Sequence, residues 1–140
     1  GGRRTEFTVA TVELPDVGDS AMVAVRTVDL DAAADAVQLN IQHPAQFTVT
    51  SPACAGIFAG GSSLGTASVA GGTVIGCFLL LGDVSGMTGD IMTFVLTRAG
   101  AGAGGATISL GVGGVLGTQF SDAGSSIAPG TTNTLRVTGS

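Results

Sequence analysis

Three glycines in the segment TRAGAGAGGATISL have a spacing that can serve phosphate binding. Gly100, Gly102 and Gly105 fit the pattern G-x-G-x-x-G, which lets a backbone approach the pyrophosphate of a dinucleotide. That fingerprint needs a helix directly after the last glycine and an acidic residue about 20 positions further on. Here Ile108 and Leu110 alternate with polar or small residues, as in a strand. The segment is therefore predicted to be a flexible connection between two strands and not a nucleotide site.

A second motif matches the serine nucleophile of hydrolases. Residues 61–65 fit G-x-S-x-G with Ser63 as nucleophile, but this motif requires a strand-to-helix turn and a histidine later in the chain. The one histidine, His43, precedes Ser63 and is more simply a strand-end residue before Pro44. A Ser/His/Asp site assembled in another order stays open from the residues alone. We expect no catalytic residue and no enzyme activity.

Aspartates gather in two segments that could supply oxygen ligands to Ca²⁺. Asp29, Asp31 and Asp35 lie in DLDAAAD, while Asp83 and Asp90 bracket GDVSGMTGD. The first segment lacks the glycine and the terminal glutamate of an EF-hand loop. We expect both segments to be solvated loops without metal or other cofactor; a structural Ca²⁺ at the first is the alternative.

The two cysteines, Cys54 and Cys77, are predicted to form one disulfide bond. No CxxC pair and only one histidine accompany them, so a zinc site is poorly supported. A disulfide would place the protein outside the cytosol, in an extracellular or cell-surface location. The alternative is two separate buried thiols that pack as small hydrophobic side chains.

The composition excludes several classes of partner. Of the 140 residues 44% are hydrophobic and 11% are charged, and Lys, Trp and Tyr are absent. A net charge of -5 disfavours nucleic acid and anionic lipid. The longest apolar run, Thr73–Gly82, is shorter than the ~20 residues that span a bilayer, so no membrane insertion is expected. The opening residues GGRRTEF contain no apolar signal stretch, which suggests a mature or processed end.

Short segments of alternating polarity predict strands. In AVQLNIQ, apolar residues Val37, Leu39 and Ile41 are expected to face a core, with Gln38, Asn40 and Gln42 facing water. The segment DIMTFVLTR repeats this alternation. Further strands are expected at Phe7–Leu14, Ala21–Leu30, Gln46–Thr50, Val74–Leu81, Thr107–Val112 and Thr134–Thr138. The run Val74–Leu81 is apolar throughout, which predicts burial on both faces.

Turn residues separate these strands, notably in PDVGD at Pro15–Asp19 and in SDAG at Ser121–Gly124. No alternation of strands with helices occurs. The chain is therefore predicted to be all-β: a single domain over residues 1–140, built as a two-sheet β-sandwich with jelly-roll topology and eight or nine strands.

Several segments, in chain order and over nearly the whole length, resemble the cohesin domain, a β-sandwich module of cellulosome scaffold proteins and other extracellular proteins. They are VGDSAMVAVRTVDL, AVQLNIQHPAQFTVTSPACAGIF, GDIMTFVLTRAGAGAGGATISL and FSDAGSSI. His43-Pro44 replaces the family's Tyr-Asp-Pro turn, so no role of that tyrosine or aspartate is carried over. The resemblance implies a cohesin-like topology and non-catalytic binding between proteins.

Two kinds of protein partner follow from these features. The leading hypothesis is an extracellular structural subunit that associates with copies of itself into a filament or surface array. Residues 1–14 would form an N-terminal strand exchanged with, or docked on, another copy by β-augmentation, with Phe7, Val9 and Val12 in contact.

The second hypothesis is a cohesin-type receptor that binds a dockerin-like helical partner on one sheet face. The polar positions Gln38, Asn40 and Gln42 are the predicted contacts for that partner. A carbohydrate-binding module is a further alternative, although sugar-binding sandwiches usually stack pyranose rings on the Trp and Tyr side chains that this chain lacks.

Overall fold

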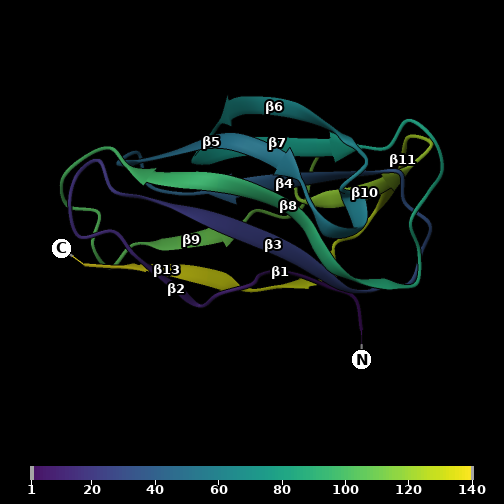
Figure 1. Ribbon diagram of the computed structural model, residues 1–140, viewed down its shortest axis with the longest axis horizontal. Coiled ribbons are helices and arrows are strands. Elements are labelled where there is room, and N and C mark those ends of the chain that lie inside the picture. The colour runs from purple at the N-terminus through teal and green to yellow at the C-terminus, as the bar shows by residue number, and fades with distance from the viewer. Residues whose placement is uncertain (1, 140) are drawn as a thin grey trace.

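The computed structural model, which describes residues 2–139, is a sandwich of two β-sheets (Figure 1). Gly1 and Ser140, the ends of the predicted domain, lie outside the described residues. The predicted all-β fold is confirmed, with thirteen strands in place of eight or nine. The strands are β1 (Arg4–Phe7), β2 (Thr11–Glu13), β3 (Ser20–Leu30), β4 (Ala36–Gln42), β5 (Phe47–Cys54), β6 (Ser62–Val69), β7 (Gly72–Phe78), β8 (Met87–Arg98), β9 (Thr107–Leu110), β10 (Gln119–Asp122), β11 (Ser125–Ile127), β12 (Thr131–Thr132) and β13 (Thr134–Thr138).

The described residues include one short 3-10 turn, η1 (Gly56–Phe58). Within this part of the chain, no helix is long and apolar enough to cross a membrane.

The strands divide between two sheets of different size. The first sheet has the order β12-β1-β3-β8-β5. The second has the order β11-β10-β4-β9-β13-β2, and β7 pairs with β4 while β6 pairs with β7. Two pairings are parallel, β1 with β12 and β2 with β13. Because β1 belongs to the first sheet and β2 to the second, the N-terminal segment ties both sheets together.

The core lies between the sheets and is built from the predicted alternation. Val37, Leu39 and Ile41 on β4 are buried, as are Met92, Phe94 and Leu96 on β8. Near one end, the rings of Phe58 and Phe120 stack with their centroids 6.4 Å apart. The inward rows of both sheets thus cover each other, as expected for a sandwich.

Several predicted strands have different bounds: β5 continues to Cys54 beyond the predicted Thr50, and β9 ends at Leu110 before the predicted Val112. The single strand expected at Phe7–Leu14 is wrong: β1 ends at Phe7 and β2 begins at Thr11, because the chain crosses between the sheets there. The strand expected at Val74–Leu81 ends at Phe78, and Leu80 and Leu81 are 79% and 92% exposed. The expectation that this whole run is buried is therefore also wrong for its last residues.

Both predicted reversals are present. Asp19 donates its backbone N–H to the carbonyl of Asp16 at 3.1 Å, within the turn before β3. Ala123 and Gly124 have φ values of 49° and 87° in the β10–β11 hairpin. A two-residue hairpin turn of this hand requires positive φ at both positions.

The loop that carries Gly100, Gly102 and Gly105 connects β8 to β9 and is followed by a strand, as predicted. At its start, the buried guanidinium of Arg98 donates hydrogen bonds to three carbonyl oxygens, those of Leu14 (3.0 Å), Pro15 (2.7 Å) and Gly100 (3.3 Å). Arg98 thus joins the end of β8 to the segment that follows β2.

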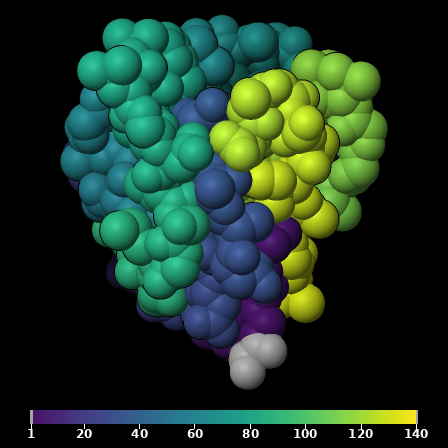
Figure 2. All heavy atoms as spheres, turned by 90° about the vertical axis from the view of Figure 1, so that its right-hand side faces the viewer, coloured from purple at the N-terminus to yellow at the C-terminus, as the bar shows by residue number. Residues whose placement is uncertain are grey.

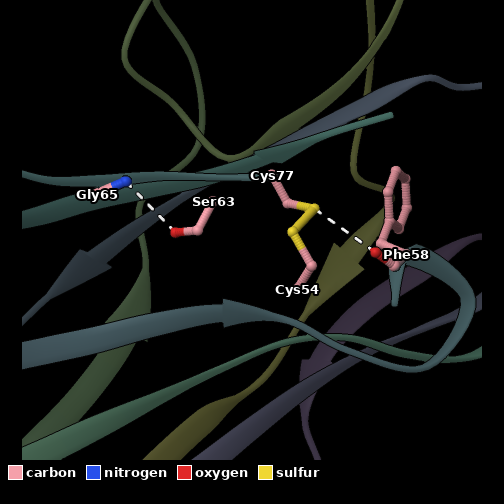
Figure 3. Close-up of a disulfide and its surroundings, with 5 residues drawn as sticks. All are labelled: Cys54, Phe58, Ser63, Gly65 and Cys77. Carbon is pink, nitrogen blue, oxygen red and sulfur yellow. Dashed lines mark hydrogen bonds between the residues drawn. A yellow bond between two sulfur atoms is a disulfide. The ribbon is translucent and has the colours of Figure 1, made fainter. Parts of the chain in front are cut away.

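The predicted disulfide between Cys54 and Cys77 is present, with the two Cα atoms 5.7 Å apart (Figure 3). Cys54 ends β5 in the first sheet and Cys77 lies in β7 of the second. The bond therefore links the sheets covalently beside the core, where Cys77 is fully buried.

Replacing both cysteines (Cys54→Ala with Cys77→Ala) is expected to lower the free energy of unfolding by about 3 kcal/mol, because the unfolded chain regains the freedom of the closed loop. Urea denaturation of the oxidised proteins measures this difference. Reducing agent should shift the midpoint of the wild type and leave the double variant unchanged. Equal midpoints for oxidised wild type and variant would contradict the expectation.

Candidate functional site

The three residues predicted as contacts for a helical partner form a row on the outer face of the second sheet. Gln38, Asn40 and Gln42 alternate along β4 with buried residues, so their side chains point away from the core. Strand β7 lies along one edge of β4, and β10 and β9 lie along the other. We name these three residues the amide row.

The amide row holds a loop against the sheet. Gln38 donates from Nε2 to the carbonyl oxygens of Val115 (3.0 Å) and Gly117 (2.9 Å). Asn40 donates from Nδ2 to the carbonyl oxygen of Leu116 at 3.0 Å. These carbonyls belong to residues 111–118, the β9–β10 loop. Gln42 donates from Nε2 to the carbonyl oxygen of Ala70 at 3.3 Å, so all three predicted contact side chains are occupied by the chain's own backbone.

Glycines allow the β9–β10 loop to fold tightly. Gly113 and Gly114 have φ values of 87° and 74°, a region that side chains disfavour. A Cβ atom at Gly117 would lie 2.4 Å from the carbonyl oxygen of Gly113, so the backbone can close only without a side chain there. In this loop the side chains of Val112, Val115 and Leu116 are exposed, while Thr118 is buried.

Aliphatic side chains beside the amide row project into water. Val115 and Leu116, from the β9–β10 loop, are 88% and 52% exposed, and Leu64 on β6 is 66% exposed. Leu64 lies over Gly76, which pairs with Gln38, and together they line a shallow hollow of about 110 Å³. We name Leu64, Val115 and Leu116 the outer-face patch. Sequence periodicity missed it because two of its members lie in a glycine-rich loop.

The predicted N-terminal contacts differ in exposure. Phe7 is buried in the chain's own core, Val12 is half-buried on β2, and Val9 is 45% exposed between β1 and β2. The side-chain amide of Asn133 accepts from the backbone N–H of Phe7 at 2.7 Å and donates to its carbonyl at 3.1 Å. Phe7 can reach another molecule only after this segment leaves its own sheet.

Asp35 lies apart from the other two predicted Ca²⁺ candidates, Asp29 and Asp31, which line one shallow hollow. Asp31 pairs with Arg3, while Asp35 meets Asp83 and, at the end of β10, Asp122. One carboxylate oxygen of each member of this second group lies within 4.8 Å of the others. Figure 2 views this end of the molecule, where the blue, green and yellow parts of the chain meet. The sequence does not mark Asp122 as a metal ligand, because its motif SDAG predicts a turn.

The surroundings of Asp31 and Asp122 shift the pKa values of these two carboxyl groups in opposite directions. The hydrogen bond from Arg3 lowers the pKa of Asp31, and its positive charge adds to that effect. Partial desolvation raises the pKa of Asp122, and the neighbouring charge of Asp83 raises it further. Carboxylate oxygens suit hard cations such as Ca²⁺, and Asp35, Asp83 and Asp122 are the residues that could hold one here.

The hydrolase motif does not form a nucleophile elbow. Ser63 lies in β6, and its Oγ accepts a hydrogen bond from the backbone N–H of Gly65 at 3.3 Å (Figure 3). The ring of His43 contacts the hydroxyl of Thr73 and the carbonyl of Pro44. Among the described residues, no hydrogen bond joins Ser63 to His43.

No protein-family model matches this sequence, and the comparison with curated proteins finds no relative. Solved structures do match, and several of them are cohesin modules. A non-cellulosomal cohesin from the archaeon Archaeoglobus fulgidus is 15% identical, with a TM-score of 0.67 over 98% of this chain and 91% of that one.

Two further cohesins match over 98% of their own length. The module of a family 33 glycoside hydrolase from Clostridium perfringens is 12% identical and covers 99% of this chain, with a TM-score of 0.69. The third ScaC cohesin of Acetivibrio cellulolyticus, in complex with the ScaB dockerin, is 13% identical and covers 98%, with a TM-score of 0.68. At these identities the likeness establishes the fold, and the predicted cohesin-like sandwich is confirmed.

Removing the loop's anchors should loosen it. In the Gln38→Ala and Asn40→Ala variants, amide hydrogen exchange over residues 112–117 is expected to accelerate, with about 1 kcal/mol less stability for each lost hydrogen bond. Gln46→Ala is the control, because the described residues offer no hydrogen bond to the Gln46 side chain. Exchange in the loop that stays at the wild-type rate in both variants would argue against anchoring by the amide row.

The raised pKa of Asp122 makes the stability of the fold depend on pH. The folded protein holds the Asp122 proton more tightly than the unfolded chain does, so stability falls as the pH rises from 3.8 through the raised pKa. Asp122→Asn is therefore expected to increase Tm near neutral pH and to leave it unchanged well below pH 3.8. The exposed Asp90, outside this group, supplies the control Asp90→Asn. A decrease in Tm at neutral pH in Asp122→Asn would contradict the expectation.

Proposed function

We propose that this protein is a non-catalytic, extracellular binding module that receives a helical protein partner on the outer face of its second sheet. The observation that carries the proposal is the outer-face patch on a cohesin-like sandwich. Leu64, Val115 and Leu116 are each more than half exposed, and grouped aliphatic side chains of this kind are typical of interaction sites. The likeness to a cohesin that is itself bound to a dockerin supports the same kind of role.

The chemistry of this face favours an uncharged contact. Strands β4, β6 and β7 and the β9–β10 loop contain no Asp, Glu, Lys or Arg. An amphipathic helix whose apolar side packs on the outer-face patch would bury these side chains, with one apolar group in the hollow beside Leu64. Association through such a face would depend little on ionic strength.

The extracellular assignment rests on the disulfide. Cys54 and Cys77 form a bond that joins the two sheets, and structural disulfides persist in oxidising compartments. The non-catalytic assignment is supported by the separate hydrogen-bond partners of Ser63 and His43.

Self-assembly into a filament or surface array by strand exchange is the second candidate. It is favoured by the short ladder of β2, three residues paired with β13 at the margin of the second sheet, and by the exposed Val9 beside it. The clamp of Asn133 on Phe7 opposes release of the segment. Negative-stain microscopy separates the candidates, since filaments would support exchange and single particles would support the receptor.

The receptor function is tested with dockerin modules as probes, beginning with the Acetivibrio cellulolyticus ScaB dockerin. At least one module in a panel of this kind is expected to bind in titration calorimetry. Val115→Asp should weaken binding at least ~10-fold, because it places a charge within the buried contact. Leu81→Asp is the matched control, since Leu81 is 92% exposed but lies outside the patch. Failure of every dockerin to bind, or equal binding by both variants, would overturn the proposal.

A further inference from the structure

Strand β6 differs from the other strands at the sheet margins. The remaining margins are blunted in ways that usually prevent association: β2, β11 and β12 have three residues or fewer, and β5 contains Pro52 and a register shift after Thr50. Strand β6 has eight residues and contains no proline and no charge. Among the described strands at the margins, β6 is long and has neither proline nor charge, and its register shift between Ser63 and Thr66 leaves Thr66–Val69 regular.

One edge of β6 is open. Strand β7 pairs along the other edge, from Ser62 opposite Phe78 to Val69 opposite Gly72. In Figure 1, β6 lies along the upper margin of the sandwich, and no described strand pairs beyond it. Residues 62–68 are exposed at every position. Backbone N–H and C=O groups at such an edge are a template for a further strand.

Charge is segregated away from this margin. No Asp, Glu, Lys or Arg occurs between His43 and Asp83, a span that contains all of β5, β6 and β7. All ten acidic residues and five arginines, and hence the net charge of -5, lie elsewhere. Two copies of a chain with this net charge repel each other least through a surface that has none of it. A charged partner would instead be attracted to other parts of the molecule.

We propose that a second copy of this chain pairs its own β6 antiparallel along the free edge of β6, giving a two-fold symmetric dimer. The regular half of the strand, Thr66–Val69, makes the pairing, because the bulge at Gly65 (φ 82°) is confined to the segment between Ser63 and Thr66. Small side chains then oppose small side chains across the axis, and no like charges meet.

The side chains on the two faces of β6 suit this arrangement. Thr66 and Ser68 line a groove of about 500 Å³ toward β5, together with Thr48 and Thr50. Ala67 lies on the opposite, outer side with Leu64. A paired copy would place its own Thr66 and Ser68 along the same groove, where hydroxyl groups offer partners to one another and to water.

The two-fold axis closes the assembly at two copies, since an isologous contact uses the same surface on both subunits. The axis of an antiparallel pair runs perpendicular to the sheet, so both outer-face patches would lie on one side of a continuous sheet. The dimer uses the edge of the sheet and the proposed receptor function uses its face, so each stands without the other.

Sedimentation of the oxidised full chain over a concentration series tests the proposal, with dimers expected within the range from about 1 µM to about 1 mM. The double variant Thr66→Lys with Ser68→Lys puts two positive charges on each approaching edge and should raise Kd at least ~10-fold. Thr11→Lys, an exposed threonine on β2, is the matched control and should dimerise as the wild type does.

Amide hydrogen exchange gives a second readout that identifies the surface. In the wild type, exchange over residues 66–69 should slow as the concentration rises, and circular dichroism should show that both variants are folded. A chain that stays monomeric throughout, a dimer insensitive to the double lysine variant, or protection confined to another strand would each overturn the proposal. Dockerin binding by the single variant Ser68→Lys reports separately on the face, because Ser68 does not line the hollow beside Leu64.

Discussion

Mutual burial of the two inward rows is the interaction on which the other features depend. Each sheet has one apolar face, and neither face is stable in water alone. Once β4 and β8 point Leu39 and Phe94 into the shared core, their alternate residues must point outward. The amide row is outward for that reason. Its position in the middle of the second sheet, between β7 on one side and β9 and β10 on the other, then fixes where the β9–β10 loop can be anchored.

Sequence reasoning recovered the parts of the fold that local alternation determines. The faces of β4, the inward residues of β8 and the hairpin at Asp122 follow from residue types within a short window, and the disulfide follows from the presence of two cysteines. It failed where tertiary neighbours decide. Strand β6 has no buried row to reveal it, and Leu80 and Leu81 continue an apolar run beyond the end of β7. The meeting of Asp35 with Asp122 depends on loop contacts that no sequence window contains.

The surface divides into regions with different physical character. Acidic groups gather at the loop end that holds Asp35, Asp83 and Asp122, whereas the margin formed by β5, β6 and β7 has no formal charge. The uncharged margin can approach another protein with less electrostatic repulsion than the acidic end. A dimer joined at β6 would present two receptor faces together, so a partner with two helices could bind both with increased avidity.

In Figure 1 the described chain enters at the lower right and runs leftward from β1 to β2, which lies beside β13, and β13 ends at the left. The ladders that join these segments, β1 with β12 and β2 with β13, are both parallel. Tension applied along the long axis would therefore load these two short ladders in shear, so that the hydrogen bonds within each ladder break together, and resistance to pulling would be governed by the rate of forced unfolding.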